Sequence, residues 1–430
     1  MSPGGCRMSR LKLASAALGV LLAAAPCFAV HAETAAPQTV GLSGDRLRRV
    51  HELVERTIAA GEIAGAVTLV ARNGQIAYLE AQGVMDLESK RPMQADSMFR
   101  IASMSKPVAA VAILMLAKEG KVRLNDPVSR FIPSYANLEV AVAKPARLGP
   151  GGPPAAAASD GPPEFYTVPA EREITVLDLL THTSGLMSGP IGNAAGNAAF
   201  NKRHDVGLKW VEELAAAPLE FQPGARWAYS AVAGFDALAR IVEIASGQEY
   251  YAFLAERLFG PLGMRDVTFW PNAGQRSRLA TVYQRRDGRF VVSDNPDSMS
   301  GQRYHGGGGG IMTTAETYAQ FAMMLANGGE LNGVRILSPR TVELMGSAFI
   351  PSSLQGRPAG EGYGLGVRVV TDAAARRTWL SEGSFGWSGV YGTHFWVDPK
   401  ENLVGILLAQ TSSRTFLSDF ENAVMQALVD

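Results

Sequence analysis

The chain has 430 residues, 47% hydrophobic and 19% charged, and its 40 basic side chains balance 40 acidic ones. That balance leaves no electrostatic footprint for nucleic acid or anionic lipid, and neither a phosphate-cradling G-x-x-x-x-G-K-[ST] motif nor a metal-ligand spacing such as H-x-x-x-H occurs. The length instead suggests two domains, or one large domain with an inserted part.

The first residues have the pattern of a secretory signal peptide. Two arginines and a lysine precede the apolar run LASAALGVLLAAAPCFAV, and the following VHA offers small residues for cleavage after Ala32. We expect residues 1–32 to be removed and the protein to be periplasmic or secreted, without a stable membrane anchor. Both cysteines, Cys6 and Cys27, leave with this segment, which excludes disulfides, thiolate metal sites and cysteine nucleophiles. The remaining chain has 37 basic and 40 acidic side chains.

The next segments have the periodicities of a helix and of a hairpin. Residues 43–61 place apolar side chains on one helical face and end at a glycine. Residues 64–83 form two β-rich runs around Asn73-Gly74, the strongest short hairpin signal. Residues 110–120, AVAILMLAKEG, are apolar nearly all round, which predicts a buried helix.

The middle of the chain is less regular. Residues 141–169 are rich in proline, glycine and alanine and predict a long irregular insertion, after which helical segments continue to about residue 300. A run of glycines over 306–310 then enters a helix near Thr314. Because no phosphate motif accompanies them, these glycines indicate close backbone approach rather than anion binding.

The end of the chain returns to strands, with two β-rich runs around an Asp-Pro turn and a last amphipathic helix over 415–429. Strands at both ends predict an α/β fold with one antiparallel sheet built from both termini and flanked by helices. We expect an α/β domain of residues 33–130 and 302–430 and an inserted, mainly helical domain of residues 131–301. An active site would lie between the two.

One stretch, RIASMSKPVAA over residues 100–110, contains the spacing Ser-x-x-Lys. On a helix that begins near Ser103, Ser103 and Lys106 share one face, and Pro107 fits the first turn. A buried lysine can lose its proton and then activate a serine, while the helix N-terminus favours a developing oxyanion. Ser105 faces away from Lys106, so we interpret it as a helix-start residue.

Ser-x-x-Lys alone is a weak signal, because the same spacing occurs at SRLK inside the expected signal peptide. Three further motifs accompany the second copy. PGARWAYS places Tyr229 at the entrance of a helix, GWSGVYGTHFW places Trp387, Ser388 and Gly389 at the head of a strand, and LLTHTSGL covers residues 179–186.

With these motifs in this order, the chain resembles the serine β-lactamase and penicillin-binding-protein superfamily over almost its whole mature length. Within it, the chain is most similar to the family VIII carboxylesterases, which are related to class C β-lactamases. The resemblance implies a β-lactamase-like fold, with Ser103 as the acylated nucleophile and Lys106 as its base. Tyr229 would be a second proton carrier, and the backbone amides of Ser103 and Val390 would form the oxyanion hole. It implies no metal and no cofactor.

The same resemblance assigns substrate binding to Trp387, Ser388 and Gly389, where a side chain on the glycine would obstruct the substrate. Two departures from the lactamase pattern matter. Ala231 stands where Tyr-x-Asn carries its asparagine, and Trp387 replaces the lysine of Lys-Thr-Gly. A lysine–carboxylate pair at about 4 Å contributes on the order of 1–4 kcal/mol, so its loss penalises anionic β-lactams.

These departures favour an exported serine carboxylesterase that acts on a small, neutral acyl ester. Two alternatives stay open at this point. One is a class C-like β-lactamase, D-alanyl peptidase or acyltransferase with the same residues. The other is a non-catalytic, penicillin-binding-like ligand-binding protein.

Other candidate residues have simpler interpretations. Tyr135–Asn137 matches Tyr-x-Asn but precedes the proline-rich insertion, which predicts a surface loop. His182 and Ser184 in THTSG suggest a histidine-activated serine, yet no G-x-S-x-G elbow occurs and a polar turn is the better explanation. His394 alternates with aromatic residues and is interpreted as a packed or edge residue of a strand.

Overall fold

An eight-stranded antiparallel sheet joins the two ends of the chain. The computed structural model describes residues 1–2, 4, 34–145, 161–350 and 354–429. The strands of the large sheet follow the order β13-β14-β15-β16-β17-β1-β2-β3. Their bounds are β1 Gly65–Arg72, β2 Gln75–Asp86, β3 Arg91–Pro92, β13 Glu361–Tyr363, β14 Arg368–Val370, β15 Phe385–Gly389, β16 Thr393–Asp398 and β17 Leu403–Ala409. The expected sheet built from both termini is therefore confirmed, because β17 pairs with β1.

Smaller sheets and the helices complete the fold. The remaining strands form a three-stranded sheet and three hairpins: β4 Phe99–Arg100, β10 Met312–Thr313 and β7 Val267–Thr268; β5 Glu139–Ala143 and β6 Phe165–Pro169; β8 Tyr283–Arg286 and β9 Arg289–Val292; β11 Glu330–Leu331 and β12 Val334–Arg335. The α-helices are α1 Gly44–Ala59, α2 Ser105–Lys118, α3 Val176–Leu180, α4 Pro190–Asn201, α5 Arg203–Val206, α6 Ala233–Ser246, α7 Tyr250–Leu254, α8 Ala273–Ser277, α9 Ala315–Ala326, α10 Pro339–Met345, α11 Ala373–Arg376 and α12 Arg414–Met425. Short 3-10 helices are η1 Pro37–Val40, η2 Ala102–Met104, η3 Val128–Arg130, η4 Pro133–Asn137 and η5 Gly207–Ala216, and η6 Ala255–Phe259 is a π-helix.

The predicted hairpin is the β1–β2 pair. Asn73 and Gly74 have φ values of 54° and 75°, the left-handed conformations that a tight two-residue turn requires. Every residue of β1 and of β17 is buried, because helices cover both faces of the sheet. The pairing of these two strands places β1 inside the sheet, between β17 and β2.

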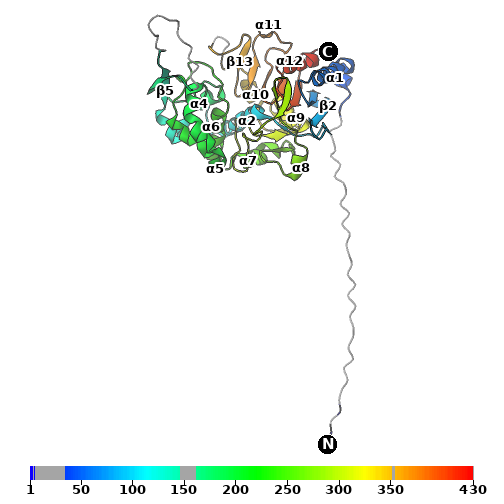
Figure 1. Ribbon diagram of the computed structural model, residues 1–430, viewed down its shortest axis with the longest axis horizontal. Coiled ribbons are helices and arrows are strands. Elements are labelled where there is room, and N and C mark those ends of the chain that lie inside the picture. The colour runs from blue at the N-terminus through cyan, green and yellow to red at the C-terminus, as the bar shows by residue number, and fades with distance from the viewer. Residues whose placement is uncertain (3, 5–33, 146–160, 351–353, 430) are drawn as a thin grey trace. The chain divides into compact units, whose positions relative to one another are not determined.

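Alternating side chains of β16 show how the two faces are covered. Trp396 packs against Phe420 of α12, with ring centroids 5.4 Å apart, on the face that also receives α1. Its neighbour Phe395 points to the opposite face and contacts Tyr318 of α9, with centroids 5.0 Å apart. Figure 1 shows α1 and α12 next to each other beside the N-terminal strands, with α4, α5 and α6 on the other side of the unit.

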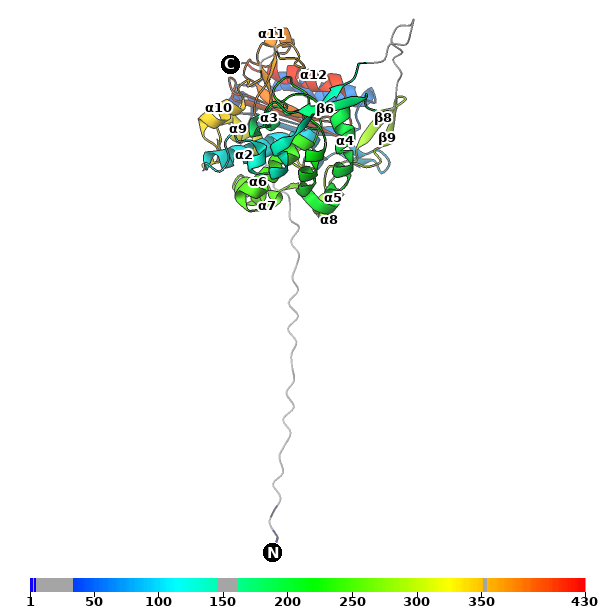
Figure 2. The ribbon, with the colours of Figure 1, turned by 90° about the vertical axis from the view of Figure 1, so that its left-hand side faces the viewer.

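Helix α2 connects the sheet to the helical middle of the chain. All its residues from Ser105 to Leu116 are buried, as its apolar composition predicts. It packs against α6, and the two helices lie side by side in Figures 1 and 2. The residues that follow β4 and begin α2 are thereby held between the sheet and the helices.

Two details of the middle differ from the expectation. The ends of the insertion 141–169 are regular, because β5 pairs with β6 from Glu139–Pro169 to Ala143–Phe165. Residues 146–160 lie outside the described part of the chain. Tyr135 is not in an exposed loop: it is 1% exposed in η4, and its hydroxyl donates to the carbonyl oxygen of Val211 at 2.8 Å.

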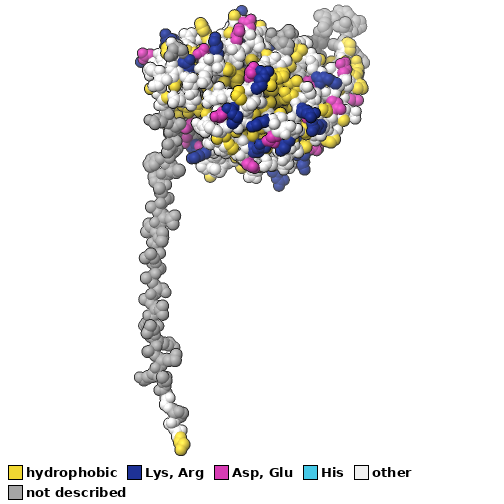
Figure 3. Space-filling view, turned by 180° about the vertical axis from the view of Figure 1, so that it is seen from behind, with side chains coloured by type: hydrophobic (Ala, Val, Ile, Leu, Met, Phe, Trp, Pro, Cys, Tyr) yellow, Lys and Arg dark blue, Asp and Glu magenta, His cyan; other side chains and the backbone are white. Residues whose placement is uncertain are grey.

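The described residues from Thr34 onward form one compact unit. The predicted signal peptide lies outside the described residues, apart from three positions, and the division of this unit into two domains stays a prediction. No helix within the described ranges combines the length and the apolar character that crossing a bilayer requires. On the face shown in Figure 3, basic side chains are interspersed with acidic ones.

Candidate active site

Ser103 lies at a sharp turn between a strand and a helix. It is the middle residue of η2, and α2 begins two residues later, at Ser105. Ala102 has a φ of 45°, which is rare for a residue with a side chain and reverses the backbone just before Ser103. The side chain of Ser103 is half-exposed, whereas Lys106, one turn further on, is fully buried.

Lys106 is held by three oxygen atoms. Its Nζ donates to Ser103 Oγ at 3.2 Å, to the carbonyl oxygen of Ala231 at 2.6 Å and to the carbonyl oxygen of Gly308 at 2.7 Å. Backbone carbonyls only accept, so two N–H groups of Lys106 are directed at Ala231 and Gly308 and the remaining position of the nitrogen faces the Ser103 hydroxyl. These contacts satisfy the hydrogen-bonding capacity of a fully buried side chain.

Tyr229 lies on the other side of the serine. Its hydroxyl donates to Ser103 Oγ at 2.7 Å. Burial alone would raise the pKa of Tyr229, but the nearby Lys106 charge and the hydrogen bond to Ser103 lower it below its usual value. The indole of Trp387 also favours the phenolate, although its N–H does not reach hydrogen-bonding geometry. The structure therefore brings the three expected residues together, with Tyr229 as the group inclined to lose a proton.

His182 holds the backbone on both sides of Tyr229. Its Nδ1 accepts a hydrogen bond from the Ser230 amide at 3.2 Å, and its carbonyl oxygen accepts one from the Ala228 amide at 3.0 Å. The imidazole is 1% exposed, and burial together with the charges of Lys106 and Arg357 lowers its pKa far below the usual value. It lies in the turn that the sequence predicts, and there it is a neutral, buried residue packed 4.7 Å from the Tyr229 ring.

The glycine run supplies one of the lysine's carbonyl partners. A Cβ on Gly308 would lie 2.8 Å from the Val232 backbone, and one on Gly307 would lie 2.2 Å from the carbonyl oxygen of Phe235. The close approach expected from the sequence is therefore observed. The buried carboxylate of Asp236 accepts from the Gly308 amide at 2.9 Å and so holds the residue whose carbonyl oxygen accepts from Lys106.

Strand β15 borders the serine on its open side. A Cβ on Gly389 would lie 2.3 Å from the carbonyl oxygen of Ile101, so the missing side chain allows the strand to approach the protein's own backbone next to η2. Thr393 Oγ1 donates to the same carbonyl at 3.1 Å. The amides of Ser103 and Val390 donate to no other group within the described ranges, and Val390 is 68% exposed.

Trp387 and Ser388 point to opposite faces of β15. The half-exposed Trp387 ring packs 5.6 Å from Tyr229 and 5.3 Å from Tyr363, measured between centroids. Ser388 Oγ instead hydrogen-bonds His394 Nδ1 at 2.8 Å. His394 is buried, as a packed strand residue should be, and its Nε2 bonds Glu421 Oε1 of α12 at 3.0 Å.

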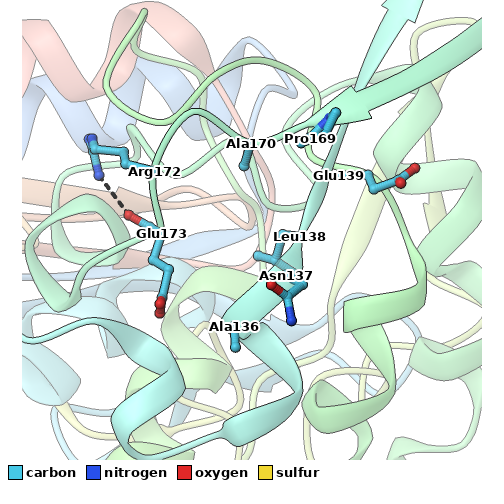
Figure 4. A pocket seen from close by; sticks show the side chains of 8 residues that line it. All are labelled: Ala136, Asn137, Leu138, Glu139, Pro169, Ala170, Arg172 and Glu173. Carbon is cyan, nitrogen blue, oxygen red and sulfur yellow. Dashed lines mark hydrogen bonds between the residues drawn. The ribbon is translucent and has the colours of Figure 1, made fainter.

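Sequence reasoning missed the groups that support the serine. They are the carbonyl oxygens of Ala231 and Gly308, the carboxylate of Asp236 and the imidazole of His182. The glycine run over 306–310 was the sequence signal that could have revealed one of them, the carbonyl oxygen of Gly308. The other Tyr-x-Asn match, Tyr135–Asn137, belongs to a separate pocket. Asn137 lines this pocket beside β5 and β6, and Arg172 there donates a hydrogen bond to the Glu173 backbone, as Figure 4 shows.

Known proteins are similar to this chain over most of its length. The family model described as Beta-lactamase matches residues 50–429. Protein Rv1367c of Mycobacterium tuberculosis is 37% identical over 368 residues, covering 82% of this chain and 86% of that protein.

Two further relatives have esterase or hydrolase names. Esterase EstB of Burkholderia gladioli is 30% identical over 386 residues, covering 85% of this chain and 90% of the esterase. Among solved structures, EstCE1, described as a hydrolase with promiscuous acyltransferase activity, aligns with a TM-score of 0.72 and 26% identity, over 89% of this chain and 99% of EstCE1.

Proposed function

Since the chain belongs to the beta-lactamase family, we propose that it is a serine hydrolase that cleaves carboxylic esters through an acyl-Ser103 intermediate. One observation carries the proposal. Ser103 Oγ lies 3.2 Å from Lys106 Nζ and 2.7 Å from the Tyr229 hydroxyl, so a half-exposed serine has a cation and a proton acceptor at once. Such contacts are what a poor nucleophile needs for activation.

The proton acceptor in this proposal is Tyr229. The sequence suggested Lys106 as the base; we assign that role to Tyr229 instead, because its hydroxyl bonds Ser103 Oγ at 2.7 Å and its pKa is lowered. Lys106 then acts as a fixed positive charge that stabilises the Tyr229 phenolate, consistent with the lowered pKa of that phenol. In the phenolate form, the Ser103 hydroxyl donates to Tyr229 along the same contact.

The acylation step follows from these positions. Tyr229 takes the Ser103 proton while Oγ attacks the ester carbonyl carbon, and the negative charge moves to the carbonyl oxygen. The amides of Ser103 and Val390 have no other partner in the described chain and serve as donors to that oxyanion. The intermediate collapses, the ester C–O bond breaks, and the Tyr229 hydroxyl returns its proton to the departing alkoxide.

Deacylation repeats the same transfers with water. The Tyr229 phenolate removes a proton from a water molecule, whose oxygen attacks the acyl carbon. The bond to Ser103 then breaks, and Tyr229 reprotonates the serine, releasing a carboxylic acid. Lys106 keeps its contacts with the carbonyl oxygens of Ala231 and Gly308 throughout this sequence.

Esters rather than β-lactams are the proposed substrates, because the wall next to the serine is aromatic. Trp387 presents an indole, not a cation, and Ala231 contributes its carbonyl oxygen to Lys106 but no side-chain amide. The similarity to EstB, a protein named as an esterase, also supports esters as the substrates.

The test is the hydrolysis of para-nitrophenyl esters by the wild type, Ser103→Ala and Tyr229→Phe. We expect Ser103→Ala to lose roughly 10³-fold or more in kcat and Tyr229→Phe roughly 10²–10⁴-fold. A chromogenic cephalosporin assayed in parallel should be turned over far more slowly than the esters. Full ester hydrolysis by Ser103→Ala would exclude the proposed nucleophile, and equal turnover of the cephalosporin would favour a β-lactamase.

A further inference from the structure

A fully buried carboxylate lies behind the lysine of the site. Asp236 belongs to the first turn of α6 and is 0% exposed. Its Oδ1 accepts from the Gly308 amide at 2.9 Å, and its Oδ2 accepts from the Tyr304 hydroxyl at 2.6 Å and from Trp210 Nε1 at 3.0 Å. An ionised carboxylate only accepts, and the start of a helix favours a negative charge. The surroundings of Asp236 therefore match its ionised form.

The glycine run approaches this carboxylate closely. A Cβ on Gly306 would lie 2.7 Å from the Tyr304 hydroxyl and 3.1 Å from Asp236 Oδ1, so a side chain at this position would push the backbone away from the acid. Gly308 contacts both ionisable side chains, because its amide donates to Asp236 while its carbonyl oxygen accepts from Lys106 Nζ at 2.7 Å. One residue of the run thus connects the buried acid to the buried amine.

Asp236 supplies a negative charge that the direct partners of Lys106 lack. Those partners are a hydroxyl and two carbonyl oxygens, none of which carries a full charge. Burial raises the pKa of Asp236, and its hydrogen bonds and the Lys106 charge oppose that shift. Arg203 of α5, Tyr250 of α7 and Tyr304 also interact electrostatically with this carboxylate. Since a buried cation without an opposite charge destabilises a fold, Asp236 can balance Lys106 through Gly308.

We propose that Asp236 is a positioning residue for ester hydrolysis: it holds Lys106 through Gly308, and its charge balances that of Lys106 beside Tyr229. This inference rests on the proposed function and adds a residue that acts on Tyr229 through Lys106. A negative charge behind Lys106 favours the ammonium and opposes the Tyr229 phenolate. Asp236 therefore raises the pH at which Tyr229 becomes the proton acceptor.

The experiment removes this charge and keeps the shape of the side chain. In Asp236→Asn, the amide oxygen can still accept from the Gly308 amide, so Lys106 keeps its place. The acid limb of kcat/KM against pH reports the base of the free enzyme. On a neutral para-nitrophenyl ester, this limb should move about one pH unit toward lower pH. The matched control is Asp398→Asn, a 0% exposed carboxylate that accepts from backbone amides after β16, which should keep the wild-type limb.

The outcomes separate this inference from the proposed function. An acid limb of Asp236→Asn that does not move, or moves toward higher pH, would overturn the inference even if kcat or stability falls. If the wild type turns over no ester, the proposed function fails, and tyrosinate absorbance then decides without substrate. The phenol that disappears in Tyr229→Phe should titrate at lower pH in Asp236→Asn than in the wild type, and an unchanged titration would contradict the role of Asp236.

Trp210 provides a second variant in case Asp236→Asn does not fold. The amide nitrogen of the asparagine replaces Oδ2, where it can donate to the Tyr304 hydroxyl but meets the Trp210 N–H, another donor. If Asp236→Asn shows no transition in a thermal melt, the double variant Trp210→Phe with Asp236→Asn is compared with Trp210→Phe alone. The double variant should show the same downward shift of the acid limb, and equal limbs in the two proteins would overturn the inference.

Discussion

At the scale of single residues, the central feature is a tyrosine whose pKa is lowered by a neighbouring lysine. Tyr229 is half-buried next to Lys106, whose Nζ lies 4.9 Å from its ring centroid. The fully buried phenols behave in the opposite way, since burial raises the pKa of Tyr250, Tyr318 and Tyr363 well above the usual value. Tyr229 should therefore ionise before these phenols.

This difference can be measured without any substrate. In a spectrophotometric titration of tyrosinate absorbance, the wild type minus Tyr229→Phe should show one phenol titrating below the usual value of about 10. Lys106→Met should move that titration upward, because it removes the charge that favours the phenolate. Ser103→Ala removes only one hydrogen bond and should move it less. Identical curves for the wild type and Tyr229→Phe below pH of about 10 would show that Lys106 does not tune Tyr229.

His182 should act as a positioning residue for Tyr229. His182→Phe keeps an aromatic ring but removes the acceptor for the Ser230 amide, so kcat should fall about 10–100-fold with little change in KM. His182→Asn can still accept that hydrogen bond and should recover most of kcat on a neutral ester. Equal losses in both variants would point to packing rather than to the hydrogen bond. The tyrosinate titration of each variant shows whether Tyr229 has moved relative to Lys106.

The sequence identified the side chains of the centre but not their supports. Ser-x-x-Lys spacing and the distant Tyr229 predicted residues that the structure does place together. No spacing rule reveals that Lys106 donates to the carbonyl oxygens of Ala231 and Gly308, because a carbonyl is present at every position. His182 does lie in the predicted turn, but nothing in the sequence indicated that this turn is buried, because only the tertiary packing buries it.

At the scale of secondary structure elements, the position of β15 against η2 determines the oxyanion site. Gly389→Ala would place a Cβ 2.3 Å from the carbonyl oxygen of Ile101 and push the strand, with the Val390 amide, away from Ser103. We expect kcat/KM to fall about 10²-fold. The matched control is Gly274→Ala on α8, where the nearest atom to a new Cβ is a side-chain oxygen at 3.4 Å. Wild-type kinetics in Gly389→Ala would show that this close approach is not required.

Helix α12 is tied to the sheet by a buried charge network. Glu421 accepts from Arg368 at 2.9 Å and bonds His394 at 3.0 Å. Burial would raise the pKa of Glu421, but the hydrogen bond to His394 and the Arg368 charge lower it to about 2. The unfolded value is about 4.3, so the unfolded chain binds the proton more tightly.

The network should therefore stabilise the protein above pH of about 4.3 and lose this contribution as pH falls toward the folded value. The shift corresponds to on the order of 3 kcal/mol. In Glu421→Gln, the free energy of unfolding should depend less on pH across this window, measured by denaturant titration at each pH. Glu52→Gln, an exposed carboxylate on α1, should retain the wild-type dependence. The same dependence in both variants would contradict the role of Glu421.

Local elements were predictable and their order in the sheet was not. Helix α1, the Asn73-Gly74 hairpin and the start of α9 near Thr314 follow from capping, turn chemistry and periodicity, which act over a few residues. The pairing of β5 with β6 joins segments on either side of a proline- and glycine-rich stretch. Composition described that stretch as irregular, because strand pairing across a long loop leaves no local signal.

At the scale of the whole molecule, the two ends of the chain combine to form the large sheet. The middle of the chain contributes Tyr229 to the site around Ser103. Ser103 follows β4, Tyr229 precedes α6, and Val390 follows β15. Family membership accounts for this arrangement, since the matched region covers residues 50–429. The division into two domains and the export of the chain without residues 1–32 stay predictions.

The central claim is that an ester acylates Ser103. Mixing the wild type with a para-nitrophenyl ester, quenching in acid within the first turnovers and analysing the peptides by mass spectrometry tests it directly. We predict one acyl group per protein, on the peptide that contains Ser103, and none in Ser103→Ala. Acyl label on any other residue would contradict the account. So would ester hydrolysis by the wild type if no acyl group can be trapped in it or in Tyr229→Phe, the variant in which deacylation is slowed.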